Sequence, residues 1–134
     1  MTSESSKQRA YAVLAFVLLA GLVLARLSAY GIWDPWELAI AETARKAAAG
    51  DVQGWVKLPV RLIGWAFAAV GTPREWVGRL PFALSGVLML GATGLAAYRF
   101  VGARVSLYAM VVLGCSPIFL LHSRQMLGQS PTFL

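Results

Sequence analysis

The ten residues Trp33-Asp34-Pro35-Trp36-Glu37-Leu38-Ala39-Ile40-Ala41-Glu42 separate a first apolar segment from the rest of the chain. They predict the start of a helix. Aspartate is a favoured N-cap residue, proline fits the first helical position, and a glutamate three residues after the cap can complete a capping box. Here Asp34, Pro35 and Glu37 have these places. The same stretch also brings two carboxylates within one helical turn, so it indicates a helix cap, a pair of reactive acids, or both.

The composition of the 134-residue chain is typical of a membrane protein. Hydrophobic residues make up 58% and charged residues 13% of the chain, and the mean hydropathy is +0.65, whereas soluble domains carry about 25% charged residues. The net charge is +6. Because the basic residues flank apolar segments, this charge favours membrane topology or contact with anionic lipid, and we expect no nucleic-acid partner.

Three segments are long and apolar enough to be transmembrane helices, at about residues 10–29, 80–98 and 105–121. A cleaved signal peptide ending near Ala29 is the alternative for the first segment, but Arg26 and the two later spans argue against cleavage. Gly86, Gly91 and Gly94 should let neighbouring helices approach the second span closely. Pro117 should kink the third span. The predicted fold is therefore all-α and embedded in a membrane.

Residues 30–78 form a large loop between the first two spans. All five tryptophans lie in it, which favours a position at the membrane–water interface. We expect one loop helix from Pro35 to about Ala49, ending at Gly50, and a second from about Pro59 to Gly71. The second is too short to cross a bilayer and is predicted to be interfacial. Residues 72–75 repeat the cap, proline and acid order of residues 34–37 and predict the start of the helix that enters the second span.

The basic residues predict the orientation of the chain. They flank the first span and the turn after the second, at Lys7, Arg9, Arg99 and Arg104. Both regions should be cytoplasmic, although the loop carries five basic residues of its own. We therefore expect a multi-pass protein of the cell (inner) membrane, with the N-terminus in the cytoplasm and the loop on the outer face together with Arg124.

Four features resemble, in order, the N-terminus of GT-C class glycosyltransferases that use polyprenyl-phosphate sugars. The families most similar are protein O-mannosyltransferases and lipid A aminoarabinose transferases. The features are Trp33-x-Pro35-x-Glu37 followed by Ala41-Glu42, then Lys57-Leu58-Pro59, Arg79-Leu80-Pro81, and Ser116-Pro117 with a basic exit at Arg124. Such enzymes are several times longer, so residues 1–134 resemble their N-terminal membrane portion. The chain departs from the family pattern at Trp36, where an acid is usual, and at Gln129, where a further acid is common.

The resemblance implies a reaction and a set of site residues. A sugar would move from a polyprenyl-phosphate donor to a hydroxyl of a protein or glycolipid acceptor on the outer face. Asp34 or Glu37 would be the catalytic base, with helix capping as the alternative role of each. Lys57 and Arg124 would bind the donor phosphate. The alternative for Lys57 is a solvated loop lysine, and the alternative for Arg124 is a contact with lipid headgroups.

Metal and cofactor chemistry receive no support from the sequence. Gln129 is not an anionic ligand, and His122 has no second histidine in the chain to bind a metal with it. We therefore predict no metal site and no cofactor. A divalent metal is possible, but no group of residues supports it. The single cysteine, Cys115, excludes a disulfide within the chain and is expected to be a small buried apolar residue. The rival function is a small non-enzymatic membrane protein or assembly subunit, whose loop only caps and anchors helices.

Overall fold

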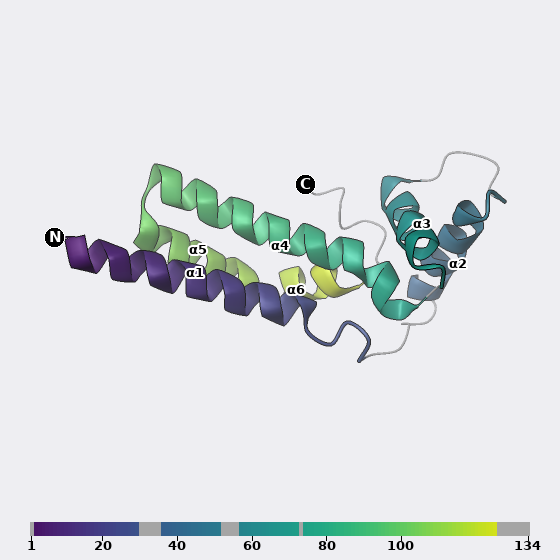
Figure 1. Cartoon of the computed structure of the whole chain (residues 1–134), viewed down its shortest axis with the longest axis horizontal. Coiled ribbons are helices and arrows are strands. Elements are labelled where there is room, and N and C mark those ends of the chain that lie inside the picture. Colours follow the sequence, from purple (N-terminus) through teal and green to yellow (C-terminus); the bar gives the residue numbers. More distant parts are fainter. Residues whose placement is uncertain (1, 30–35, 52–56, 73, 126–134) are drawn as a thin grey trace.

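The computed structural model describes residues 2–29, 36–51, 57–72 and 74–125 (Figure 1). Within these ranges the chain contains helices and no strands, in the order α1 (Thr2–Leu24), α2 (Trp36–Ala48), α3 (Leu58–Val70), α4 (Glu75–Phe100), α5 (Ala103–Gly114) and α6 (Pro117–Arg124). The all-α prediction is confirmed. Two helices, α1 from Ser6 and α4, are long and apolar enough to cross a membrane, and α5 with α6 makes a third if the bent pair is one span.

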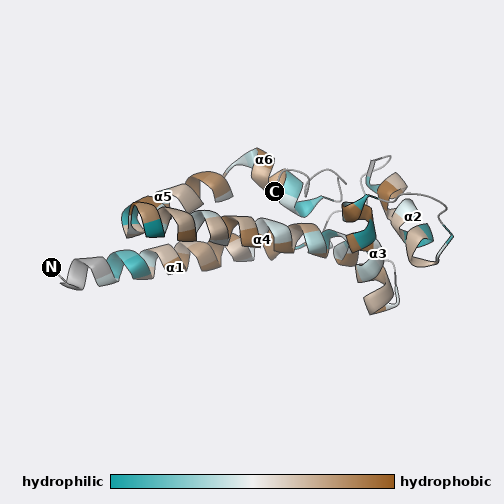
Figure 2. Cartoon of the chain, turned by 90° about the horizontal axis from the view of Figure 1, so that it is seen from above, coloured by the Kyte–Doolittle hydropathy of each residue, from teal (hydrophilic) through white to brown (hydrophobic). Residues whose placement is uncertain are grey.

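Helices α1, α4 and α5 run side by side as an elongated bundle (Figure 1). Their shared core is apolar and includes Leu19, Val23 and Leu90, of which Val23 and Leu90 are fully buried. The outside of the bundle is apolar too, because large hydrophobic side chains such as Leu88 of α4 and Val112 of α5 are exposed. Figure 2 shows that hydrophobic residues predominate along both helices. A helix that is apolar on all sides is typical of a membrane span or a large protein core.

The third predicted span is broken rather than gently kinked. Helix α5 ends at Gly114 and α6 begins at Pro117, and the two axes differ by 66°. Pro117 has no N–H to continue the helical bonds, and its ring drives Ser116 into an extended conformation, with ψ of 124°. The expected kink at Pro117 is thus present as an interruption. Cys115, expected to be buried, is exposed because it lies at this break.

Helices α2 and α3 form a small unit against the first turns of α4. Its core consists of Ala44, Val60, Ile63, Phe67, Val77 and Phe82. Gly64 allows the close approach, since a Cβ atom there would lie 3.0 Å from the carbonyl oxygen of Ala44. Both helices end as predicted at glycines with positive φ, 79° at Gly50 and 74° at Gly71.

Helix α4 joins the two cores, and its glycines contact three different neighbours. A Cβ atom at Gly86 would meet Ser123 of α6, one at Gly91 would meet Phe16 of α1, and one at Gly94 would meet Met110 of α5. The predicted thinning of this helix is confirmed. The start of α4 differs from the prediction, because Arg74 and not Thr72 is the N-cap residue and makes no side-chain capping bond.

Candidate anion-binding site

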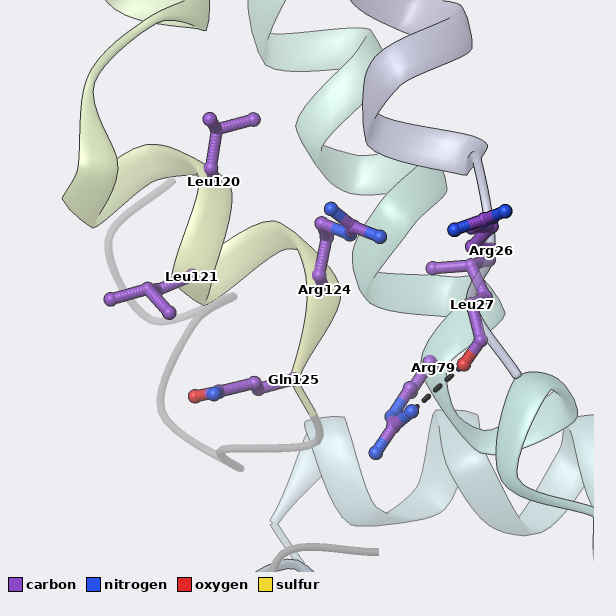
Figure 3. A pocket seen from close by; sticks show the side chains of 7 residues that line it. All are labelled: Arg26, Leu27, Arg79, Leu120, Leu121, Arg124 and Gln125. Carbon is purple, nitrogen blue, oxygen red and sulfur yellow. Dashed lines mark hydrogen bonds between the residues drawn. The ribbon is translucent and has the colours of Figure 1, made fainter. Parts of the chain in front are cut away.

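A pocket of about 260 Å³ lies at the end of the bundle that is nearest the α2–α3 unit. Three arginines from three different elements line it: Arg26 after α1, Arg79 of α4 and Arg124 of α6 (Figure 3). The other lining residues are Leu27, Leu120, Leu121 and Gln125. The described residues that line this pocket include no carboxylate, so they give it a positive charge.

Arg79 is buried and held on two sides. Its Nη2 and Nε atoms donate to the two carboxylate oxygens of Glu37, at 2.7 and 3.3 Å, and its Nη1 donates to the carbonyl oxygen of Leu27 at 2.8 Å. The Glu37 side chain is fully buried and that of Arg79 is 4% exposed. Such a two-bond arrangement fixes the plane of the guanidinium. Glu37 thus neutralises Arg79 and orients it from behind the pocket.

Arg124 is anchored by one bond only. Its Nη2 donates to the carbonyl oxygen of Ala25 at 2.7 Å. The carbonyls of Ala25 and Leu27 belong to the turn that ends α1, where helix carbonyls lack helical partners. Two arginines from later helices therefore satisfy the end of α1. A guanidinium has five N–H donors, so Arg124 keeps donors for a ligand in the pocket.

Arg26 has an unusual backbone conformation. Its φ is +52°, the only positive value among the non-glycine residues that the structure describes. The left-handed conformation costs a side-chain-bearing residue about 1–2 kcal/mol. Arg26 is exposed at the pocket, and within the described ranges its guanidinium has no hydrogen bond or ion pair. Strain of this kind is often found at functional sites.

The structure separates the residues that the sequence singled out. Arg124 lines the pocket, and Glu37 lies behind it as the partner of Arg79. Lys57 is the exposed N-cap residue of α3 and is not among the residues that line the pocket. Asp34 lies outside the described residues. Glu37 neutralises a buried arginine in addition to any capping role, so glutamine at this position would remove the counter-charge.

Arg26 and Arg79 were missed as site residues. In the sequence, Arg26 served only as an argument against signal-peptide cleavage, and Arg79 only as part of the Arg79-Leu80-Pro81 feature of the family resemblance. A signal was present, since an arginine within or beside an apolar segment is costly there and often marks a functional position. His122 of α6 donates from its Nδ1 to the carbonyl oxygen of Ile118 at 2.9 Å. Among the described residues, no group of three or more histidine, cysteine, aspartate or glutamate side chains could hold a metal ion.

Comparison with known proteins assigns the chain to no family: no family model matches it, and no curated protein and no solved structure is significantly similar.

Proposed function

We propose that this chain is the N-terminal membrane portion of an inverting glycosyltransferase that takes its sugar from a polyprenyl-phosphate donor. The observation that carries the proposal is the pocket between Arg26 and Arg124, which is cationic and lies where the apolar helices end. The sequence resemblance supplies the reaction class. The acceptor is a hydroxyl of a protein or glycolipid.

Placement in the cell membrane is the first part of the proposal. The helices α1 and α4 have the length and composition of spans, and large apolar side chains cover their outer faces, such as Val13 (63% exposed), Leu88 (72%) and Leu95 (62%). In water, this much contiguous apolar surface would favour association. In a bilayer it contacts lipid, and the pocket then lies near the headgroups, with the α2–α3 unit above it.

The pocket suits a lipid-linked phosphate. Phosphate prefers the planar, multiple N–H donors of arginine, and Arg26 and Arg124 present such donors on opposite walls of the same space. The leucines of α6 add an apolar wall for the first part of the lipid chain. Lys57 is proposed as a further phosphate contact from the loop.

The proposed chemistry needs a base and a cationic site for the leaving group. The acceptor oxygen forms a bond to the sugar carbon, the bond from that carbon to the phosphate oxygen breaks, and the hydroxyl proton passes to a carboxylate. Attack opposite to the leaving group inverts the sugar carbon. The leaving lipid phosphate gains negative charge, which the arginines stabilise. Because both oxygens of Glu37 accept bonds from Arg79, this geometry favours Asp34 as the base.

The binding half of the proposal is tested with the protein in nanodiscs and a short-chain polyprenyl phosphate as the probe, with the matching polyprenol as its uncharged control. We expect the phosphate to bind at least tenfold more tightly than the alcohol. The double variant Arg26→Gln/Arg124→Gln should lose this preference, whereas Arg74→Gln, an exposed arginine outside the pocket, should keep it. Equal affinity for phosphate and alcohol would refute the proposal and favour a non-enzymatic membrane subunit.

The catalytic half requires a transfer assay with the protein that contains this chain. Asn caps a helix about as well as Asp, so Asp34→Asn should fold normally and still bind the polyprenyl phosphate. Loss of a general base costs about 100- to 10,000-fold in rate. Transfer at the wild-type rate by Asp34→Asn would remove Asp34 from the mechanism.

A further inference from the structure

A second hollow lies at the opposite end of the bundle, between α1, α4 and α5. It has a volume of about 400 Å³ and an almost wholly apolar lining that includes Ala12, Val13, Phe16, Leu95 and Met110. Two glycines of α4, at positions 91 and 94, also line it. The floor is held closely together, since the Ser106 hydroxyl of α5 donates to the carbonyl oxygen of Gly94 at 2.7 Å. The hollow is therefore a groove with a fixed floor.

One mouth of this groove is cationic. The Arg9 guanidinium lines it and lies over the ring of Tyr98, 5.8 Å from the ring centre. The stacking holds Arg9 at the groove by a cation–π interaction. Three other cations belong to the same end of the bundle, where the N-terminus of α1 meets the α4–α5 turn (Figure 1): Lys7, Arg99 and Arg104.

The charge at this end is not balanced by the sequence around it. Residues 5–33 and 76–134 contain no aspartate or glutamate, so Glu4 is the one carboxylate in the segments that form this end. Arg9 thus lies at the mouth of the apolar groove, at an end of the bundle whose sequence is rich in basic residues and poor in acids. The arrangement is complementary to a molecule with an anionic head and a hydrocarbon tail.

From this complementarity we infer that the groove binds one anionic phospholipid, with an acyl chain between α1 and α4 and the headgroup phosphate at Arg9. The inference rests on the membrane placement within the proposed function and not on the transferase chemistry. Arg9 to Phe16 spans seven residues of helix, or about 10 Å, so the groove takes part of one chain. Basic pockets between helices at the cytoplasmic side of membrane proteins bind anionic headgroups in this way. The site differs from the arginine pocket, whose lining shares no residue with it.

The test is native mass spectrometry of the detergent-solubilised protein titrated with phosphatidylglycerol or phosphatidylcholine of the same chains. We expect one phosphatidylglycerol to be retained in preference to phosphatidylcholine. Arg9→Gln should lower this preference about fivefold, the effect of one basic residue close to an anionic lipid. Arg104→Gln removes an equal charge from the same end but does not line the groove, so it should change the preference less than twofold.

A second pair of variants tests the groove itself. Leu95→Trp keeps every charge and should fill the groove, so retention of the lipid should fall, whereas Leu88→Trp is a matched change at an exposed site of α4 outside the groove and should have no effect. Equal losses for Arg9→Gln and Arg104→Gln, or retention of both lipids alike, would overturn the inference. Release of the protein from vesicles by alkaline washing would instead refute the membrane placement. Loss of polyprenyl-phosphate binding with retained phosphatidylglycerol would refute the proposed function alone.

Discussion

At the residue scale, the pair of Glu37 and Arg79 changes the meaning of the opening motif. Glu37 is fully buried and both of its oxygens accept from the guanidinium. Removing two charges from water is costly, and the pair offsets that cost through its geometry and through the Leu27 carbonyl. The pair lies where α4 passes from one apolar core to the other, so it ties the α2–α3 unit to the bundle.

Breaking this pair should therefore destabilise the protein. Glu37→Gln leaves a buried arginine without its counter-charge, and the expected loss is about 3–5 kcal/mol. The double variant Glu37→Gln/Arg79→Met removes both charges and should recover much of that loss. Thermal unfolding in detergent compares the stability of the wild type, the single variant and the double variant. A single variant as stable as the wild type would show that the pair contributes nothing to the fold.

A second residue-scale prediction concerns Glu42, which is exposed on α2. The Arg45 guanidinium donates to its carboxylate at 2.7 Å and holds the pKa of Glu42 below its ordinary value, with Lys46 adding to the effect. A lowered pKa in the folded state means that the stabilisation is present above the ordinary value of about 4.3 and is lost as the pH falls through the lowered pKa. Arg45→Gln should raise the pKa of Glu42, measured by carboxyl NMR titration; an unchanged titration would exclude the ion pair in solution.

At the element scale, the glycines of α4 set how closely its neighbours pack. They are not equivalent, because the atoms facing them differ in freedom to move. A Cβ atom at Gly86 would lie 2.6 Å from the Ser123 Cβ, which is attached directly to the backbone of α6, whereas one at Gly94 would lie 2.5 Å from the Met110 Sδ, near the end of a flexible side chain. The two close approaches should therefore respond differently to substitution.

Gly86→Ala should cost about 1–3 kcal/mol, the usual penalty for overpacking, because α6 has to shift. Gly94→Ala should cost less, since Met110 can change its rotamer. Gly21→Ala, where no heavy atom lies within 4 Å, is the control and should be neutral or stabilising, since alanine favours a helix over glycine by about 0.5–1 kcal/mol. Thermal unfolding of the three variants checks the order; the reverse order for Gly86 and Gly94 would contradict the packing described here.

At the scale of the whole molecule, the two basic segments and the α2–α3 unit lie at opposite ends of the bundle. The N-terminal part of α1 and the α4–α5 turn are together at one end, and the α2–α3 unit and α6 are at the other (Figure 1). This arrangement agrees with the predicted grouping of Lys7, Arg9, Arg99 and Arg104 on one side. It also places Arg124 on the side of the loop.

The orientation in the membrane is tested by labelling with an impermeant thiol reagent. Because Cys115 is exposed, the background for the test is Cys115→Ala. In that background, Asp51→Cys should react from outside intact cells, and Phe100→Cys should react only after permeabilisation, since basic residues favour the cytoplasm. The opposite pattern would invert the proposed topology, and with it the side of the arginine pocket.

The features that depend on local physics could be predicted from the residues alone. Apolar segments of sufficient length indicated the long helices, Gly50 and Gly71 marked the ends of α2 and α3 because glycine adopts positive φ at little cost, and Pro117 indicated the interruption before α6. Arg124, which the sequence analysis names as a phosphate-binding residue, lines the pocket, and its ligand stays a proposal.

Contacts between residues far apart in the chain could not be predicted in this way. Glu37 and Arg79, and Arg124 and Ala25, are far apart along the chain, and no local rule pairs them, because each contact depends on how the helices pack. The same holds for Cys115, whose exposure follows from the angle between α5 and α6 and not from its apolar neighbours in sequence. Helix formation is governed by neighbours within about four residues, whereas a site assembled from α4, α6 and the turn after α1 is governed by the packing of the whole bundle.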